Sequence, residues 1–547
     1  MFCYQCEQTF RGTGCVDNGV CGKDPATADL QDLLVHGLKG VAMYADRARR
    51  AGATDAEINE WALTALFATG TNVNFDAGNI EELIRRGAVV RDRARALYQE
   101  ACRAAGQAPE ALAGPAQFEP AATRDELLLQ AFQIATPKRM VTLGEDVAGL
   151  QELVVYGLKG AAAYAEHARQ LGKEDADIYA GLYEILNVVA DPASGQDALL
   201  GAALKTGELN YRVMAMLDAA NTGAYGHPSP TSIRVEPRRG KAIVVSGHDL
   251  ADLHALLEQT AGKGINVYTH GELLPAHGYP KLRAFPHLAG NYGGAWMLQQ
   301  GEFSNFPGAI LMTSNCIQEP RESYSGRLFT SGPVRWPGVP HIENRDYSAV
   351  IEAALAAPGF TEDGSGQEIL TGFGHNAVMS VAGQVVEAVK SGALRHFYLI
   401  GGCDGARPGR NYYAEFAQSV PQDCMVLTLG CGKFRFNKQE FGTVAGLPRL
   451  LDIGQCNDAY SAIQIALALS QAFECGVNDL PLSLIISWYE QKAVAVLLTL
   501  LHLGVRNIRI GPTLPAFVGP ATLKLLVETF NLMPIGNVEA DLAATLA

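Results

Sequence analysis

The sequence predicts an α plus α/β multidomain fold: a helical N-terminal domain of two repeated helix bundles, followed by two doubly wound, Rossmann-like α/β domains. Three observations lead to this prediction. The length of 547 residues allows roughly three or four domains. Residues 1–225 are rich in Ala, Leu, Arg and Glu, which favours helices. Beyond them, short β-branched runs alternate with helical patterns, as in parallel α/β sheets.

An internal repeat supports the two helix bundles. The segment LQDLLVHGLKGVAMYADRARRAG at 30–52 returns as LQELVVYGLKGAAAYAEHARQLG at 150–172, with 14 of 23 positions identical. Both copies place apolar residues at helical spacing and end on glycine, a common helix stop. The stretch 105–122, rich in Ala and Pro, separates them. Two similar bundles side by side are the simplest arrangement.

Two segments predict the domain boundaries. The stretch 226–240 holds three prolines and resembles a linker, and 357–374 is rich in Gly and acidic residues. The predicted domains are therefore the helical domain at 1–225 and two α/β domains at 226–366 and 367–547.

The charge and hydropathy of the chain argue against several classes of protein. The net charge of −14 disfavours binding to nucleic acid or to an anionic membrane. The start of the chain shows no secretory signal, and the apolar run at 493–505 is too short to span a bilayer. We expect a cytoplasmic protein, in which the 11 cysteines serve metal binding or redox chemistry rather than structural disulfides.

Seven predicted strands of the α/β half end on a potential metal ligand. In open parallel sheets, ligands bind beyond the carboxyl ends of the strands. A single Cys after an apolar strand is more often a buried core residue, but four such cysteines in one pattern are harder to explain by packing. The seven residues are His248, Glu272, Cys316, Cys403, Cys431, Cys456 and Glu490.

This donor set indicates a polynuclear iron site. One zinc ion takes four ligands, so seven are too many for it. Thiolates select iron–sulfur clusters or copper, whereas imidazole and carboxylate suit harder, oxygen-coordinated iron. The four cysteines are 87, 28 and 25 residues apart, which does not match a zinc-knuckle motif. A mixed iron site with an exchangeable oxygen side is the interpretation that fits.

Four more cysteines open the chain in the pattern Cys3-x2-Cys6-x8-Cys15-x5-Cys21. The spacing alone leaves iron–sulfur and zinc both open. A reductive site further along the chain would need single electrons, and this favours an iron–sulfur cluster here. Cys102, Cys424 and Cys475 match no motif.

The motifs SGHD, THGE, SNC, GGCDG, LGCGKFRFN, GQCND and WYEQKAVAV, with the N-terminal cysteines, closely resemble the hybrid cluster protein (prismane, hydroxylamine reductase) family over essentially the whole chain. The resemblance implies a 4Fe-4S cluster on the four N-terminal cysteines, whose short spacing is that of the cubane type. It also implies a hybrid iron–sulfur–oxygen cluster (4Fe-2S-2O type) on the seven strand-end residues, with Cys403 as the persulfidated cysteine. Relatives often carry two adjacent tryptophans where this chain has Trp296 followed by Met297.

The activity implied is reduction of hydroxylamine to ammonia, or of nitric oxide to nitrous oxide, with electrons from a separate donor protein. The residues expected to act in catalysis are Glu272, Cys403, Glu490 and Lys492. Lys492 follows Glu490 closely and would donate a proton or hold a negatively charged intermediate; its alternative is a charged residue at a helix start. Two further functions stay open: a carbon monoxide dehydrogenase-like enzyme, and a nitric oxide or oxidative-stress sensor or S-nitrosating protein.

Overall fold

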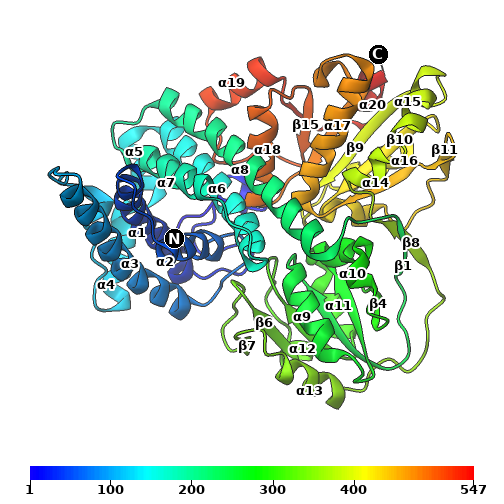
Figure 1. The fold of residues 1–547 in the computed structure, drawn as a ribbon, viewed down its shortest axis with the longest axis horizontal. Helices are drawn as coiled ribbons and strands as arrows, with labels where there is room; N and C mark the ends of the chain where they lie inside the picture. Colours follow the sequence, from blue (N-terminus) through cyan, green and yellow to red (C-terminus); the bar gives the residue numbers. More distant parts are fainter. Residues whose placement is uncertain (547) are drawn as a thin grey trace.

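The computed structural model describes residues 1–546, and its first part is helical, as predicted (Figure 1). The helices of this region are α1 (Pro25–Arg50), α2 (Ala56–Ala68), α3 (Ala77–Ala104), α4 (Arg124–Ile134), α5 (Thr136–Leu143), α6 (Glu145–Gln170), α7 (Ala176–Ala190) and α8 (Gln196–Tyr225). Among the described residues, no helix is both long and apolar enough to cross a membrane.

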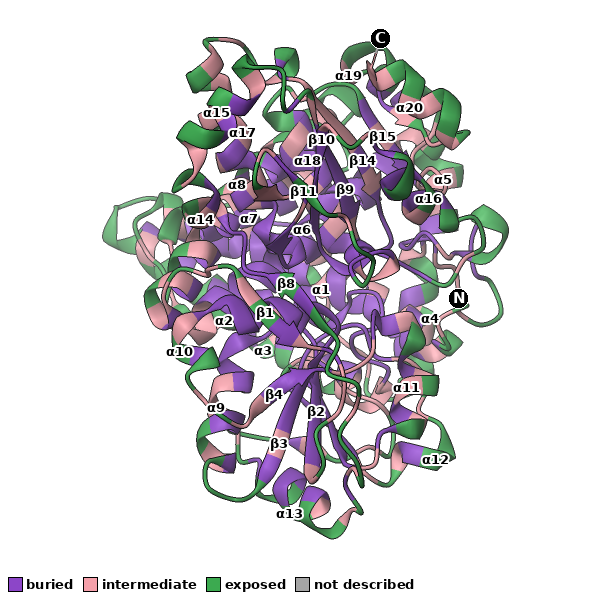
Figure 2. Cartoon of the chain, turned by 90° about the vertical axis from the view of Figure 1, so that its right-hand side faces the viewer, coloured by how far each residue is buried: buried purple, intermediate pink, exposed green. Residues whose placement is uncertain are grey.

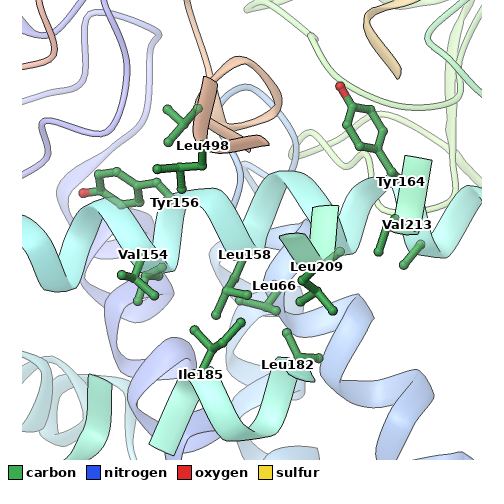
Figure 3. Packing of buried hydrophobic residues seen from close by; sticks show 14 of the residues in the cluster. Leu66, Val154, Tyr156, Leu158, Tyr164, Leu182, Ile185, Leu209, Val213 and Leu498 are labelled. Carbon is green, nitrogen blue, oxygen red and sulfur yellow. The ribbon is translucent and has the colours of Figure 1, made fainter. Parts of the chain in front are cut away.

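The two copies of the repeat lie on α1 and α6, and each begins a unit of three helices. Helix α1 packs on α3, and α6 packs on α8. The second helix of each unit also packs on the first helix of the other, α2 on α6 and α7 on α1. Figure 3 shows the result: Leu66 of α2 and Ile185 of α7 lie close to Leu158 of α6. The two predicted bundles therefore share one hydrophobic core.

Glycines of the repeat bring a C-terminal helix, α18 (Gln491–His502), against α6. A Cβ atom on Gly160 would lie 2.4 Å from the carbonyl oxygen of Gln491, and one on Gly157 would lie 2.7 Å from the side chain of Leu498. Only glycine permits such a close approach of two helices. The start of α18 is thereby held on the helical region.

The first α/β unit contains a parallel sheet of six strands in the order β4-β3-β2-β5-β6-β7. The strands are β2 (Lys241–Ser246), β3 (Ile265–His270), β4 (Leu288–Asn291), β5 (Ala309–Met312), β6 (Leu328–Ser331) and β7 (His341–Ile342). The helices are α9 (Leu250–Thr260), α10 (Pro280–Arg283), α11 (Gln299–Asn305), α12 (Glu322–Ser325) and α13 (Ser348–Ala356).

The second α/β unit contains another parallel six-stranded sheet, in the order β13-β10-β9-β14-β15-β16. The strands are β9 (His396–Gly402), β10 (Cys424–Leu429), β13 (Leu450–Gly454), β14 (Leu482–Ser487), β15 (Ile508–Gly511) and β16 (Met533–Pro534), beside a small hairpin of β11 (Thr443–Val444) and β12 (Leu447–Pro448). The helices are α14 (His375–Met379), α15 (Ala382–Lys390), α16 (Asn411–Ser419), α17 (Ala459–Phe473), α18, α19 (Pro520–Phe530) and α20 (Val538–Leu546).

The two sheets have the same order when their strands are numbered along the chain, 3-2-1-4-5-6, which is the doubly wound arrangement. Each has a switch point, between β2 and β5 in one sheet and between β9 and β14 in the other, where ligands bind in such folds. Figure 2 shows one sheet above the other, with buried residues continuing between them. The predicted fold class is confirmed.

The two segments predicted to separate the domains lie next to each other. β1 (Thr231–Arg234) pairs antiparallel with β8 (Glu368–Thr371), and Gly240 forms a bridge with Phe360. The chain thus enters and leaves the first α/β unit through one small two-stranded sheet. The boundaries at 225 and 366 remain predictions.

Candidate active site

The seven strand-end residues meet in one buried cavity between the two sheets, with an empty volume of about 390 Å³. They come from β2, β3 and β5 of the first sheet and from β9, β10, β13 and β14 of the second. Each side chain is buried. All seven are among the residues that line the cavity: His248, Glu272, Cys316, Cys403, Cys431, Cys456 and Glu490.

His248 presents a neutral imidazole to this cavity. Its Nδ1 lies 2.9 Å from Ser314 Oγ, and its Nε2 lies 3.8 Å from Glu272 Oε2. Burial, followed by the positive charges of Lys492 and His167, lowers the pKa of His248 well below its usual value. Neutral imidazole with one nitrogen hydrogen-bonded and the other free is the form that binds metals.

Glu272 has one oxygen bound and one oxygen free. Its Oε2 accepts a hydrogen bond of 2.7 Å from the backbone N–H of Cys456, whereas its buried Oε1 has no hydrogen-bond partner within residues 1–546. Burial raises the pKa of this carboxyl. Donor atoms of His248, Glu272 and Cys456 all lie within 4.8 Å of one another. A buried oxygen without a partner is costly, and a metal ion would satisfy it.

The four cavity cysteines are free, buried thiols. Burial raises the pKa of each well above its usual value, and the neighbouring carboxylates add to the effect. Cys403 Sγ lies 3.9 Å from Glu490 Oε1. Thiolates packed this closely beside carboxylates repel one another, and cations would relieve this repulsion.

Glu490 and Lys492 form the start of helix α18. Glu490 Oε2 accepts a hydrogen bond of 3.0 Å from the Lys492 backbone N–H, so the carboxylate caps the helix while it lines the cavity. Lys492 Nζ donates to Asn315 Oδ1 and lies 3.7 Å from Glu490 Oε1. Burial lowers the pKa of Lys492, but the charge of Glu490 and the nearby cysteines outweighs it, and the pKa rises above its ordinary value. The ammonium group is thus charged at neutral pH.

One residue that connects the sheets was not identified from the sequence. Gln455, which directly follows β13 of the second sheet, donates from Nε2 to the backbone oxygens of His248 at 2.9 Å and Glu272 at 2.7 Å. Both acceptors belong to the first sheet. The only sequence signal is its position directly before Cys456, because its partners are more than 180 residues away along the chain.

The N-terminal cysteines form a second cluster of thiols. Cys3 and Cys15 exchange two backbone hydrogen bonds of 3.0 and 2.8 Å, which fold the segment back on itself. Burial raises the pKa of Cys3 to about 11. Burial also raises the pKa of Cys6 well above its usual value, and the thiols of Cys21, Cys3 and Cys15 add to this shift. Cys6 and Cys15 are buried, whereas Cys3 and Cys21 are half-buried.

Two aromatic rings lie between the thiol clusters. Trp296 and Tyr489 stack with ring centres 4.5 Å apart, and Cys6 packs in the same cluster as these rings, Cys316 and Cys403. The Trp296 indole donates to the Asp404 carbonyl at 2.8 Å. Trp296, which has no second tryptophan beside it in the sequence, therefore stacks on Tyr489, and the sequence spacing did not predict this contact.

The three cysteines without a motif lie elsewhere. Cys102 is buried on α3 in the helical core, Cys424 begins strand β10, and Cys475 is half-buried after α17. His375, which stands near a strand end in the sequence, contacts Ser461 at 2.9 Å.

The residues at the cavity fit an iron–sulfur centre with an oxygen-coordinated side. The unpartnered Glu272 Oε1, the neutral His248 and four buried thiols supply both soft and hard donors in one place. The four N-terminal thiols supply a set of soft donors alone, as a cubane cluster requires.

Known proteins share this architecture. A family model described as the Prismane/CO dehydrogenase family matches residues 1–543. A hydroxylamine reductase of Burkholderia ambifaria (strain MC40-6) is 59% identical over 551 residues, which cover 100% of this chain and 99% of that protein. One of Syntrophobacter fumaroxidans is 55% identical, with 100% of both chains covered.

Solved structures of carbon monoxide dehydrogenases have the same fold at low sequence identity. The as-isolated Ni-free enzyme from Thermococcus sp. AM4 has a TM-score of 0.55 at 16% identity and covers 99% of this chain and 90% of that one. Carbon monoxide dehydrogenase IV from Carboxydothermus hydrogenoformans has a TM-score of 0.56 at 14% identity, with 97% and 89% covered. From the full-length match, the chain belongs to the Prismane/CO dehydrogenase family.

Proposed function

We propose that the protein is an iron–sulfur oxidoreductase that reduces hydroxylamine to ammonia. The observation that carries the proposal is the cavity between the two sheets, where four thiols, one imidazole and two carboxylates meet in a buried site. The relatives named hydroxylamine reductase, at 55–59% identity over full length, support the choice of substrate.

In this proposal the strand-end residues hold a hybrid 4Fe-2S-2O-type cluster, and Cys3, Cys6, Cys15 and Cys21 hold a 4Fe-4S cluster. When bound, these centres supply electrons and a Lewis acid for the nitrogen–oxygen bond. The free Oε1 of Glu272 and the carboxylate of Glu490 are the exchangeable ligands on the oxygen side. Cys403, which contacts Glu490, is the candidate for persulfidation.

Lys492 is the proposed proton donor. Reduction of hydroxylamine takes up two electrons and two protons and yields ammonia and water, so it requires a proton source in a buried site. Lys492 Nζ contacts Asn315 and Glu490, which both line the cavity, so its charged form holds a proton next to the cavity. Protonation of the leaving oxygen from Nζ would release water. Glu490 and Asn315 hold the ammonium group in position for this transfer.

The route of electrons would begin at the N-terminal cysteines, where Cys3 and Cys21 are half-buried, and continue past Tyr489 and Trp296. A separate donor protein would deliver the electrons. Nitric oxide reduction to nitrous oxide at the same cavity is the second activity to test, because it also needs electrons and protons at a buried iron site.

The experiment that tests the proposal joins metal analysis with turnover. Anaerobically purified protein should hold about eight irons, in two sets distinguishable by paramagnetic resonance. It should form ammonia from hydroxylamine with a chemical reductant, and a Lys492→Gln variant should retain iron but lose most of this activity. Stoichiometric nickel would favour carbon monoxide chemistry instead. Intact clusters without steady-state ammonia formation would favour the sensor or S-nitrosating alternative.

A further inference from the structure

Gln491, the first residue of α18, connects this helix to the N-terminal segment. Its Nε2 donates a hydrogen bond of 2.8 Å to the backbone oxygen of Gln5 and one of 2.9 Å to Thr71 Oγ1. Its Oε1 accepts a hydrogen bond of 2.7 Å from the Thr71 backbone N–H. Gln491 is buried, and both N–H groups and the oxygen of its amide are hydrogen-bonded. The side chain therefore has one fixed orientation.

The two ends of this connection stand next to potential metal ligands. Gln5 directly precedes Cys6, one of the N-terminal cysteines, and Gln491 directly follows Glu490, one of the cavity carboxylates. Gln5 is also held from its other end, because its Oε1 accepts a hydrogen bond of 3.0 Å from Lys159 Nζ of α6. Gln5 is thus fixed between α6 and α18, and any displacement of Cys6 reaches it through the backbone that joins them.

A second set of contacts joins the same two segments on the other side of Cys6. The backbone N–H of Glu7 donates to the Tyr489 carbonyl oxygen at 2.9 Å. Arg410 donates from Nη2 to Glu7 Oε2 at 2.7 Å and to the Trp488 carbonyl oxygen at 2.9 Å. The two segments are therefore joined at several points along their length.

The position of Gln491 affects the cavity through its two neighbours. Glu490 Oε2 accepts a hydrogen bond of 3.0 Å from the Lys492 backbone N–H, and Glu490 Oε1 lies 3.9 Å from Cys403 Sγ. The backbone of Gln491 joins Glu490 to Lys492, and its carbonyl oxygen packs closely on Gly160 of α6. Closely packed elements transmit a displacement rather than absorb it. A shift of Gln491 therefore moves the Glu490 carboxylate.

We infer that Gln491 is a positioning residue that couples the state of the N-terminal cysteine site to the geometry of Glu490 in the cavity. The inference rests on the proposed function, since it takes both sites to hold iron. Metal binding or a change of charge at the N-terminal site displaces Cys6, and Gln5 and Gln491 pass this displacement to Glu490. An electron that arrives near the surface thereby alters a carboxylate proposed to exchange at the cavity. Such coupling acts in both directions.

Gln491→Glu tests the connection at one hydrogen bond. A carboxylate at this position still accepts hydrogen bonds from the N–H and the hydroxyl of Thr71, but it cannot donate to Gln5. The matched control is Thr71→Val, which removes one hydrogen bond of Gln491 and keeps the one to Gln5. In each of these proteins, Cys15→Ala is added to empty the N-terminal site, because Cys15 does not line the cavity.

Iron-57 Mössbauer spectroscopy of the cavity iron is the readout, since it reports the ligands of each iron without turnover. Cys15→Ala alone should remove about four irons and shift the spectrum of those that remain. Gln491→Glu should keep about eight irons with a shifted cavity spectrum, and Cys15→Ala added to it should cause a further shift at least about threefold smaller than in the unmodified background. In Thr71→Val, the shift caused by Cys15→Ala should be complete.

Two results would overturn the inference. One is a cavity spectrum that Cys15→Ala alone leaves unchanged, a comparison that needs no change at Gln491 and so does not depend on the stability of Gln491→Glu. The other is an equal shift caused by Cys15→Ala with and without Gln491→Glu. Absence of ammonia formation by the unmodified, iron-loaded protein would contradict the proposed function alone.

Discussion

The two six-stranded sheets share one strand order but present different donor atoms to the cavity between them. The first sheet supplies His248, Glu272 and one thiol, that of Cys316. The second supplies three thiols and the carboxylate of Glu490, which also caps α18. The shared topology determines where these side chains meet, at the carboxyl ends of the strands. The residues that follow the strands determine the chemistry. The first sheet therefore supplies mainly nitrogen and oxygen donors, which form the hard side of the cavity, and the second sheet supplies mainly thiols, which form its soft side.

The sheets also differ in how they are attached to the rest of the chain. In the second unit, the fully buried Arg410 binds Glu7 of the N-terminal segment at 2.7 Å and Asp404 at 3.4 Å. In the first unit, the partly exposed Arg345 binds Asp252 at 2.7 Å and Gln170 of α6 at 2.7 Å. The second unit is therefore attached to the N-terminal segment through a buried ion pair, whereas the partly exposed Arg345 attaches the first unit to α6 through a hydrogen bond to the neutral Gln170.

Removal of a thiol from the second sheet should have the largest effect. Cys431→Ser should lose about four irons and reduce ammonia formation more than about a hundredfold, because it removes a direct soft ligand. Iron analysis and paramagnetic resonance check this result. The control is Cys424→Ser. Cys424 is also a buried thiol, but it begins strand β10, whereas Cys431 follows the end of that strand. Equal iron loss in both variants would show that the effect is one of folding.

Arg410→Met should destabilise the attachment of the second unit by about 3 kcal/mol, because it removes the buried positive charge that Glu7 and Asp404 share. Arg407 at 3.2 Å from Glu7 and Arg435 at 2.7 Å from Asp404 still contact the two carboxylates. Chemical denaturation of the protein measures this loss. Arg395→Met is a suitable control, since its ion pair with Asp423 at 3.0 Å lies at the surface. Equal stability of Arg410→Met and Arg395→Met would show that the buried Arg410–Glu7 pair does not hold the N-terminal segment on the second unit.

Glu272→Gln tests the hard side of the cavity. The amide oxygen can still accept the hydrogen bond from Cys456, but the negative charge is lost. We expect iron content to be kept, hydroxylamine kcat/KM to fall about tenfold, and the resonance spectrum of the hybrid set to change. Glu302→Gln changes a comparable carboxylate, which binds His270 at 2.9 Å in the same unit, and should leave the spectrum unaltered. An unchanged spectrum in Glu272→Gln would remove this residue from the ligand set.

The smallest effect concerns pH and the first unit. Burial, followed by the charge of Asp249, raises the pKa of Asp252 from 3.8 to about 6. The folded state thus holds this proton more tightly than the unfolded state. The stabilising contribution is fullest below pH 3.8 and declines as the pH rises through about 6.

Relative to Asp252→Asn, the unmodified protein should therefore lose about 1 kcal/mol of unfolding free energy between about pH 5 and about pH 8. Denaturant titrations of both proteins at several pH values measure the difference. A difference that does not vary with pH would show that Asp252 does not titrate in this range.

Much of the fold and of the site followed from local patterns. Parallel strands bring their carboxyl ends to one edge, so the residues after seven apolar runs predicted the cavity lining, from His248 to Glu490. The helical repeat predicted α1 and α6. These patterns are periodic or adjacent in the sequence, and that is why they can be read without a structure.

Other contacts had no local pattern. Gln455 binds His248 and Glu272 across the two sheets, and Arg410 binds Glu7 at the opposite end of the chain. The closeness of Cys6 to Trp296 depends on how the N-terminal segment packs on the second unit. Each of these depends on the arrangement of whole units, which hydrophobic periodicity within one element does not encode.

The carboxylate of Glu490 begins a helix as well as facing the cavity. One of its oxygens holds the Lys492 amide hydrogen of α18, and that helix rests on Gly160 of α6. A change in what Glu490 binds must then alter the protection of the first amides of α18 against exchange with solvent. The hydrogen–deuterium exchange rates of the first amides of α18 would therefore report what Glu490 binds, without a spectroscopic signal from iron.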